Sequence, residues 1–254
     1  EKFPLSNKLN AVPFFADSMD NEKITAQSPQ DDGGEATKQA DVLVNVEPVS
    51  GDPSSIHTAA TFMVESFWLG SPLNVLDETV RVSDSAKKSL IETQESELMD
   101  IYGERMGKRL LPTCLLLAFE KKDTKTIIGM VGIETTVLDT RRDEKFFRYE
   151  ASEETLRNAI ASLGPKERRE YKNKSLDDIS SELLPSGVGV VACLSNLSVS
   201  PKARRKGIAE KLCKEAENIV ANEWGFEDIY LRVEKANIGA QNLYGNKLGF
   251  SSIF

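Results

Sequence analysis

The residues best suited to chemistry lie in a short cationic stretch near the C-terminal end of the chain. A mostly apolar segment, residues 190–199, leads into Ser-Pro and then into three consecutive cations at 204–206, directly before Gly207. This order predicts a turn between a strand and a helix. Free N–H groups, the helix dipole and the cations would favour an anion there, and Gly207 would let the backbone approach it. The pattern predicts a cradle for a pyrophosphate; the alternative is a solvated basic turn.

The helix after this turn is indicated by its own periodicity. Apolar residues recur with a period of about 3.6 at Ile208, Leu212, Ala216, Ile219 and Val220. The segment that follows the helix, residues 228–234, has the pattern of a strand.

Taken together, these segments resemble motifs A and B of the GNAT superfamily of N-acetyltransferases, which bind acetyl-CoA. Arg204-x-x-Gly207-x-Ala209 is similar to motif A, and Asn237-x-x-Ala240-x-x-Leu243-Tyr244, followed by Gly249-Phe250, is similar to motif B. The close resemblance covers roughly the last quarter of the chain. It implies an α/β (α+β) fold, with a mixed, mostly antiparallel sheet flanked by helices. Two middle strands of this sheet splay apart to admit the pantetheine arm.

The resemblance also implies which residues hold acetyl-CoA. The main chain of Leu197, Ser198 and Val199 would pair with the pantetheine, and the Val199 N–H would support the developing oxyanion. The residues implied for the pyrophosphate are Arg204, Arg205, Lys206, Gly207, Ile208 and Ala209. Asn237 and Ala240 would line the pantetheine end.

Acetyl transfer to an amine also needs a proton donor and a proton acceptor. The resemblance makes Tyr244 the general acid; the alternative is a core tyrosine that packs beside Leu243 and Phe250. The general base stays open, because Arg232 stands where some relatives that acetylate protein N-termini have a glutamate. The candidates are Glu134, Glu234 and a water chain through Ser195 or Ser198, and both glutamates could instead be ordinary strand-end carboxylates.

Composition argues against other classes of function. Of the 254 residues 40% are hydrophobic and 28% charged, and the net charge of −8 disfavours non-specific binding to nucleic acids or anionic membranes. No apolar run approaches the roughly 20 residues of a membrane span. The single histidine, His57, is expected on a helix surface, and no metal site is predicted. Cys114, Cys193 and Cys213 are expected to be free thiols in a reducing compartment.

The remainder of the chain is expected to form a tail and one domain. Residues 1–40, polar and aperiodic, are interpreted as an N-terminal tail or linker, and residues 41–254 as the acetyltransferase domain. The patterns predict a strand at 41–49, a helix at 54–69 capped by Asp52, a helix at 84–108, and a hairpin of strands at 113–120 and 126–138. The last strand of the GNAT fold, after residue 250, is expected to be missing or supplied otherwise.

Residues 139–186 are a charged insertion where the GNAT fold has a short turn, with helical patterning around 153–163 and 166–184. The insertion is either an inert surface feature or a lid that binds the acceptor or a partner. The adjoining Gly187-x-Gly189-x-x-Ala192 matches a dinucleotide-binding fingerprint. That motif must open a helix, whereas here it opens a strand, so it is rejected.

Two functions therefore follow from the sequence. The first is an acetyl-CoA-dependent N-acetyltransferase that acts on an amine, a protein lysine or N-terminus. The segment Leu194–Pro201 is similar to plant and algal plastid members, which favours the plastid stroma over the cytoplasm. The alternative is a GNAT-fold binding subunit of a larger assembly, which docks through the N-terminal tail or the 139–186 insertion.

Overall fold

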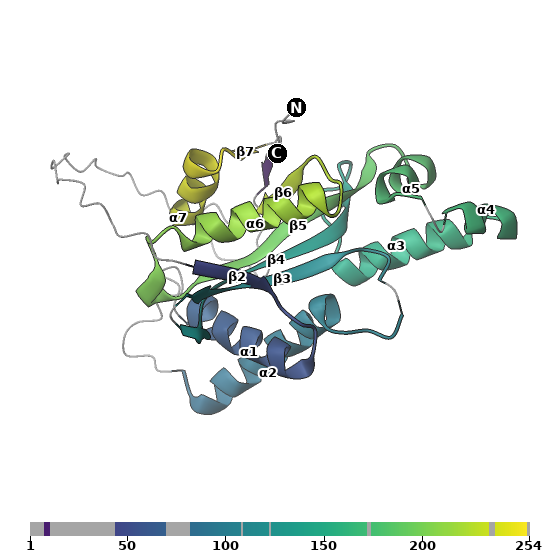
Figure 1. The fold of residues 1–254 in the computed structure, drawn as a ribbon. Helices are drawn as coiled ribbons and strands as arrows, with labels where there is room; N and C mark the ends of the chain where they lie inside the picture. The colour runs from purple at the N-terminus through teal and green to yellow at the C-terminus, as the bar shows by residue number, and fades with distance from the viewer. Residues whose placement is uncertain are drawn as a thin grey trace.

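The computed structural model describes residues 8–10, 44–69, 82–107, 109–121, 123–171, 174–233 and 237–252. At its centre is a seven-stranded sheet in the order β2-β3-β4-β5-β6-β1-β7 (Figure 1). The strands are β1 (Lys8–Asn10), β2 (Val44–Pro48), β3 (Thr113–Glu120), β4 (Asp123–Asp139), β5 (Val188–Val199), β6 (Ile229–Arg232) and β7 (Ser251–Ser252). Strands β2 to β5 pair antiparallel, and β5 pairs parallel with β6. From β2 to β6 the predicted mixed, mostly antiparallel sheet is therefore confirmed.

Strand β1 comes from the segment that the sequence indicated to be a tail. It pairs parallel with β6, from Lys8↔Tyr230 to Asn10↔Arg232, and parallel with β7. One strand at this end of the sheet is thus supplied by a distant part of the chain. Residues 1–7 and 11–43 lie outside the described part.

Helices cover both faces of the sheet (Figure 1). One face carries α1 (Pro53–Met63), the π-helix η1 (Val64–Trp68) and α2 (Asp84–Tyr102), and the other carries α6 (Ile208–Asn222). The helices α3 (Tyr149–Ala161), α4 (Pro165–Tyr171) and α5 (Leu176–Leu183) lie together beside the sheet, before β5 begins. A 3-10 turn, η3 (Pro201–Ala203), precedes α6, and α7 (Ile238–Gln241) continues into the π-helix η4 (Asn242–Lys247).

Local sequence signals account for most of these elements. The five apolar residues expected on one stripe of α6 are all buried, with Leu212 and Ala216 fully so. Asp52 caps α1 as predicted, because its carboxylate accepts hydrogen bonds from the N–H groups of Ser54 (2.9 Å) and Ser55 (3.1 Å). The hairpin of β3 and β4 is confirmed as well.

One predicted helix is wrong in extent. The helix expected at 84–108 ends at Tyr102, because Gly103 turns to an extended conformation and Glu104 donates its N–H to the Gly51 carbonyl at 2.8 Å. The helical patterning around 166–184 corresponds to two helices, α4 and α5. Ser175 starts α5 with a capping box that involves Asp178, which gives this stretch a helix start of its own.

The insertion is fastened to the domain through α3. Glu153 is 6% exposed, and its carboxylate accepts hydrogen bonds from the Leu110 N–H at 3.1 Å and from Arg105 at 3.3 Å. The Tyr149 hydroxyl donates to the Leu111 carbonyl at 2.9 Å. Burial alone would raise the pKa of Glu153, but the Leu110 hydrogen bond and the nearby guanidinium groups outweigh it and lower that pKa. Helix α3 is thus an integral part of the fold.

We expect Glu153→Ala to lower the free energy of unfolding by about 2–4 kcal/mol, because it leaves the Leu110 N–H and two arginines without their buried partner. Urea denaturation followed by fluorescence measures the loss. Glu154→Ala is the control, because Glu154 is the exposed neighbour of Glu153 on the same helix. This variant should change the free energy of unfolding by no more than about 0.5 kcal/mol. Equal effects of the two substitutions would contradict this account of the insertion.

Candidate functional site

The sheet parts between β5 and β6. The two strands pair over three residues only, from Ala192↔Ile229 to Leu194↔Leu231. Strand β4, on the other side, stays paired with β5 as far as Gly129↔Val199. A register shift in this ladder and the left-handed Asn196 (φ 54°) mark a β-bulge at the point of parting. Beyond Leu194, no described strand pairs with the β6-side edge of β5.

The main chain of β5 offers hydrogen-bonding groups on this open edge. The Ser200 N–H bonds the Ile128 carbonyl of β4 at 3.0 Å. Because successive residues of a strand point their N–H groups to alternate sides, the Val199 N–H faces away from β4. The Val199 carbonyl faces the same way, and there it accepts a hydrogen bond from Arg204 Nε at 3.1 Å. The predicted oxyanion donor therefore lies on the open edge.

A buried hydroxyl at this edge has no partner. Ser198 is 4% exposed, and its Oγ makes no hydrogen bond. An unsatisfied buried polar atom costs free energy, and such atoms are rare in native proteins. A polar ligand group along β5 would satisfy it.

The cationic turn adopts a left-handed backbone at two positions, Arg205 (φ 65°) and Gly207 (φ 76°). Helix α6 begins directly after it, and the first helical bond is donated by the Lys211 N–H to the Gly207 carbonyl at 3.1 Å. The N–H groups of the preceding three residues thus have no acceptor within the helix. A Cβ built on Gly207 would meet no atom within 4 Å, so the space before the helix is open. An anion fits these N–H groups and this space.

The three cations of the turn differ in their surroundings. Arg204 donates from Nε to the Val199 carbonyl and from Nη2 to the Ser66 carbonyl at 2.9 Å. Its side chain therefore ties the turn to β5 and to η1. In the described part of the chain neither Arg205 nor Lys206 forms an ion pair, and Arg205 is exposed.

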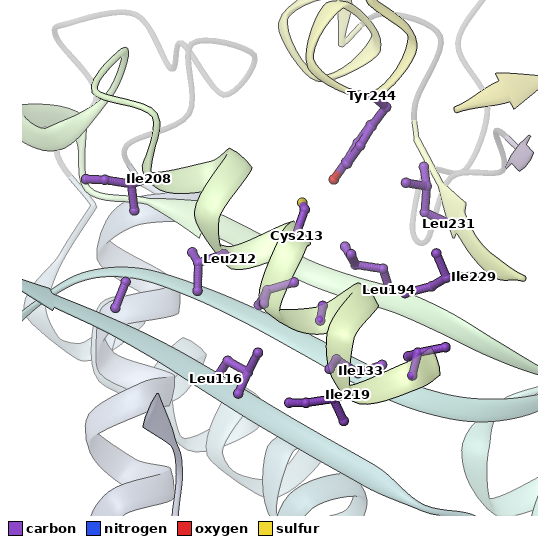
Figure 2. Close-up of a cluster of buried hydrophobic side chains, with 14 of the residues drawn as sticks. Leu116, Ile133, Leu194, Ile208, Leu212, Cys213, Ile219, Ile229, Leu231 and Tyr244 are labelled. Carbon is purple, nitrogen blue, oxygen red and sulfur yellow. The ribbon is translucent and has the colours of Figure 1, made fainter. Parts of the chain in front are cut away.

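The second motif places a tyrosine above the sheet. Asn237 caps α7, since its Oδ1 accepts the Ala240 N–H at 3.0 Å. Tyr244, in η4, is 6% exposed and packs against Phe250 with ring centroids 5.7 Å apart. Figure 2 shows its hydroxyl directed toward Cys213 of α6. Burial, followed by the neighbouring thiols of Cys213 and Cys193, raises the pKa of Tyr244, so its proton is retained at neutral pH.

The opposite face of the sheet holds a partly buried carboxyl. Glu134 on β4 lies across from Cys193 of β5. Desolvation raises the pKa of Glu134 to about 7; Arg232 opposes this shift, and Glu150 adds to it. The other sequence candidate, Glu234, lies outside the described residues.

Nearby, the Tyr102 hydroxyl and Ser195 Oγ are 3.0 Å apart. Tyr102 was not predicted from the sequence, because it lies on a helix distant in the chain and belongs to no motif.

His57 is exposed on α1, as expected, with its Nδ1 2.6 Å from a carboxylate oxygen of Glu95. The three cysteines are free thiols. Among the residues that the structure describes, no group of three His, Cys, Asp or Glu side chains could hold a metal, and no helix is long and apolar enough to cross a membrane.

Comparison with known proteins agrees with this geometry. Residues 179–250 match the family model of the acetyltransferase (GNAT) family. The GNAT match includes the open edge of β5, the cationic turn and Tyr244. Glu134 and Tyr102 lie outside it.

Curated relatives are similar over the same region. The chloroplastic GCN5-related N-acetyltransferase 7 of Arabidopsis thaliana is 41% identical over 69 residues, which are 26% of this chain and 24% of that protein. The chloroplastic GCN5-related N-acetyltransferase 4 of the same plant is 43% identical over 63 residues, 25% of this chain and 21% of that protein. The chain thus spans less than a quarter of the length of the curated relatives it matches.

Solved structures also resemble this one. A possible acetyltransferase from Clostridium difficile 630 is 14% identical, with a TM-score of 0.43, over 84% of this chain and 93% of that chain. A similarity of this size bears on neither activity nor substrate.

We expect Arg204→Lys to lower the free energy of unfolding by about 1–2 kcal/mol, although the charge is kept. A single lysine nitrogen cannot replace two guanidinium donors that bond two carbonyl oxygens in different elements. Thermal or urea denaturation measures this loss. Arg205→Lys is the matched control, because the Arg205 side chain forms no such bonds within the described part of the chain. It should change the free energy of unfolding by no more than about 0.5 kcal/mol. A similar loss in this variant would contradict the role given to Arg204.

Proposed function

We propose that the chain is an acetyl-CoA-dependent N-acetyltransferase that moves an acetyl group to an amine of a protein, at a lysine side chain or an N-terminus. The observation that carries this proposal is the open edge of β5. There the unpartnered Ser198 hydroxyl and the outward Val199 N–H lead directly into the left-handed turn before α6. The GNAT match of residues 179–250 supports it.

In this proposal, described residues would bind acetyl-CoA along its length. The main chain of Leu197, Ser198 and Val199 would pair with the pantetheine. Six residues would hold the pyrophosphate, namely Arg204, Arg205, Lys206, Gly207, Ile208 and Ala209. Because the Arg204 side chain is bonded to carbonyl groups, Arg204 would bind the pyrophosphate through its backbone N–H. The side chains of Arg205 and Lys206 would supply positive charge. Asn237 and Ala240 would line the pantetheine end.

Two groups would act on the reacting atoms. Acetyl-CoA supplies an acetyl group activated as a thioester. The Val199 N–H would stabilise the negative charge that develops on the carbonyl oxygen. Tyr244, which keeps its proton because it is buried, would donate that proton to the leaving sulfur.

We further propose a location in the plastid stroma. The support is the similarity to two Arabidopsis proteins named chloroplastic. Immunoblotting of fractionated plastids tests the location, and the absence of the protein from the stromal fraction would contradict it.

Gly207→Ala should weaken acetyl-CoA binding about fivefold to tenfold. A Cβ at φ 76° favours a different backbone and enters the open space before α6. Isothermal titration calorimetry measures the dissociation constant. Gly225→Ala is the matched control, because Gly225 has the same φ of 76° and the same open surroundings just beyond α6. Equal weakening in both variants, or no binding of acetyl-CoA to the wild type, would refute the proposed site.

Tyr244→Phe should reduce kcat about 100-fold and leave the dissociation constant of acetyl-CoA within about twofold, because only the proton donor is removed. The free energy of unfolding should change little, because this hydroxyl forms no hydrogen bond with the described residues. Release of free CoA thiol measures turnover, and Tyr171→Phe in the insertion serves as the control. Unchanged turnover would make Tyr244 a core residue only.

A further inference from the structure

A β-bulge decides which way the open edge of β5 faces. The ladder pairs Gly132 of β4 with Ser195 of β5, and the next pair that it forms is Met130 with Ser198. Between these pairs β4 has one residue and β5 has two, so β5 carries one extra residue. Asn196, the first of the two, has the left-handed backbone that one type of bulge uses. All later residues of β5 are therefore shifted by one position relative to β4.

The extra residue changes the face to which the side chains of β5 point. Before the bulge Leu194 packs in the apolar cluster that α6 covers, and after it Leu197 and Val199 pack against the same cluster. Even-numbered positions on this face thus give way to odd-numbered ones. In a regular strand Val199 would lie opposite Ile128, where Ser200 now donates its N–H to the Ile128 carbonyl. The Val199 N–H would then point toward β4, and the open edge would lose this donor.

A pair of hydroxyl groups fixes β5 directly before the bulge. The Tyr102 hydroxyl lies 3.0 Å from Ser195 Oγ, on the face of the sheet opposite α6. A Cβ on Gly132 would lie 2.2 Å from the Tyr102 oxygen and 2.8 Å from Ser195 Oγ, so glycine at this position makes room for the two hydroxyls. Burial raises the pKa of Tyr102 well above its usual value, so the hydroxyl keeps its proton and the bond persists at neutral pH.

The backbone around Tyr102 is itself held in place. Tyr102 is the last residue of α2 and is 9% exposed. Before it, the Ile101 carbonyl accepts a hydrogen bond from the Thr113 hydroxyl of β3 at 2.9 Å. After it, Glu104 donates its N–H to the Gly51 carbonyl at 2.8 Å. The position of the Tyr102 hydroxyl is therefore set by the rest of the fold and not by β5.

We propose that Tyr102 is a positioning residue for the acetyl transfer, which holds Ser195 and thereby keeps the bulge that directs the Val199 N–H to the open edge. This inference rests on the proposed function. A left-handed backbone at a residue other than glycine is strained, and it persists where surrounding contacts impose it. Tyr102 provides such a contact before Asn196, and the bond from the Ser200 N–H to β4 provides one after it.

The kinetic test compares wild type with Tyr102→Phe, which keeps the ring and removes the hydroxyl. The probes are acetyl-CoA and a peptide with one lysine and a free N-terminus. The variant should lose about tenfold in kcat, because a displaced oxyanion donor stabilises the transition state less well. Its KM for the peptide and its acetyl-CoA dissociation constant should stay within about threefold, because the cationic turn is not moved. Unchanged kcat would overturn the inference.

Two further variants separate positioning from a general loss of stability. Ser195→Ala should lower kcat as much as Tyr102→Phe, and the double variant should lose no more than either single one, because both substitutions break the same bond. Ser180→Ala is the matched control, since the buried Ser180 hydroxyl accepts a hydrogen bond from the Val190 N–H at 3.0 Å, toward the other end of β5. It should keep kcat within about twofold. A tenfold loss in this control, or additive losses in the double variant, would contradict the role given to Tyr102.

A second measurement needs no turnover. Amide hydrogen exchange at residues 196–200 of the ligand-free protein should be at least about tenfold faster in Tyr102→Phe than in wild type, because the bulge is held less firmly. In Ser180→Ala the exchange at these residues should stay near the wild-type rate. Equal rates in wild type and Tyr102→Phe would overturn the inference. Failure of the proposed function gives a different result, since wild type would then not bind acetyl-CoA in calorimetry, whatever the exchange rates show.

Discussion

The parting of β5 from β6 after Leu194 is the constraint on which the candidate site depends. Because β6 pairs with only three residues of β5, no described strand bonds the Val199 N–H, which points away from β4. Strand β4 holds the other edge in register, and the Arg204 guanidinium fixes the turn that follows. The site is therefore built mostly from backbone groups, which the fold orients before any ligand arrives. Preorganised donors of this kind need no rearrangement during reaction.

The two faces of the sheet give titratable side chains different environments. On the α6 face, Tyr244 is embedded among apolar side chains that keep it neutral. On the other face, Glu134 lies close enough to solvent to exchange protons and is desolvated enough for a raised pKa. The sheet separates the two groups, so each keeps an environment of its own.

Local signals in the sequence predicted much of the fold and the position of the cationic turn before α6. The stripe of α6, the Asp52 cap and the hairpin each depend on neighbours in the chain, and all three were confirmed. The end of α2 could not be predicted, because a hydrogen bond from Glu104 to the distant Gly51 sets it. Tyr102 was missed for the same reason, since its meeting with Ser195 joins residues 93 positions apart. The raised pKa of Glu134 likewise reflects burial by several elements.

The insertion bears on how an acceptor reaches this site. It leads into the start of β5 at Val188, whereas the open edge lies at the far end of that strand, seven residues or more away. Seven residues of strand span about 23 Å, so α3 to α5 do not cover the cationic turn. Helix α3 is held by buried groups, among them Glu153, and a lid hinged at α3 would have to break those bonds. The element tied to the cationic turn is instead η1, because the Arg204 guanidinium bonds the Ser66 carbonyl there and so connects the turn before α6 with the opposite face of the sheet (Figure 1).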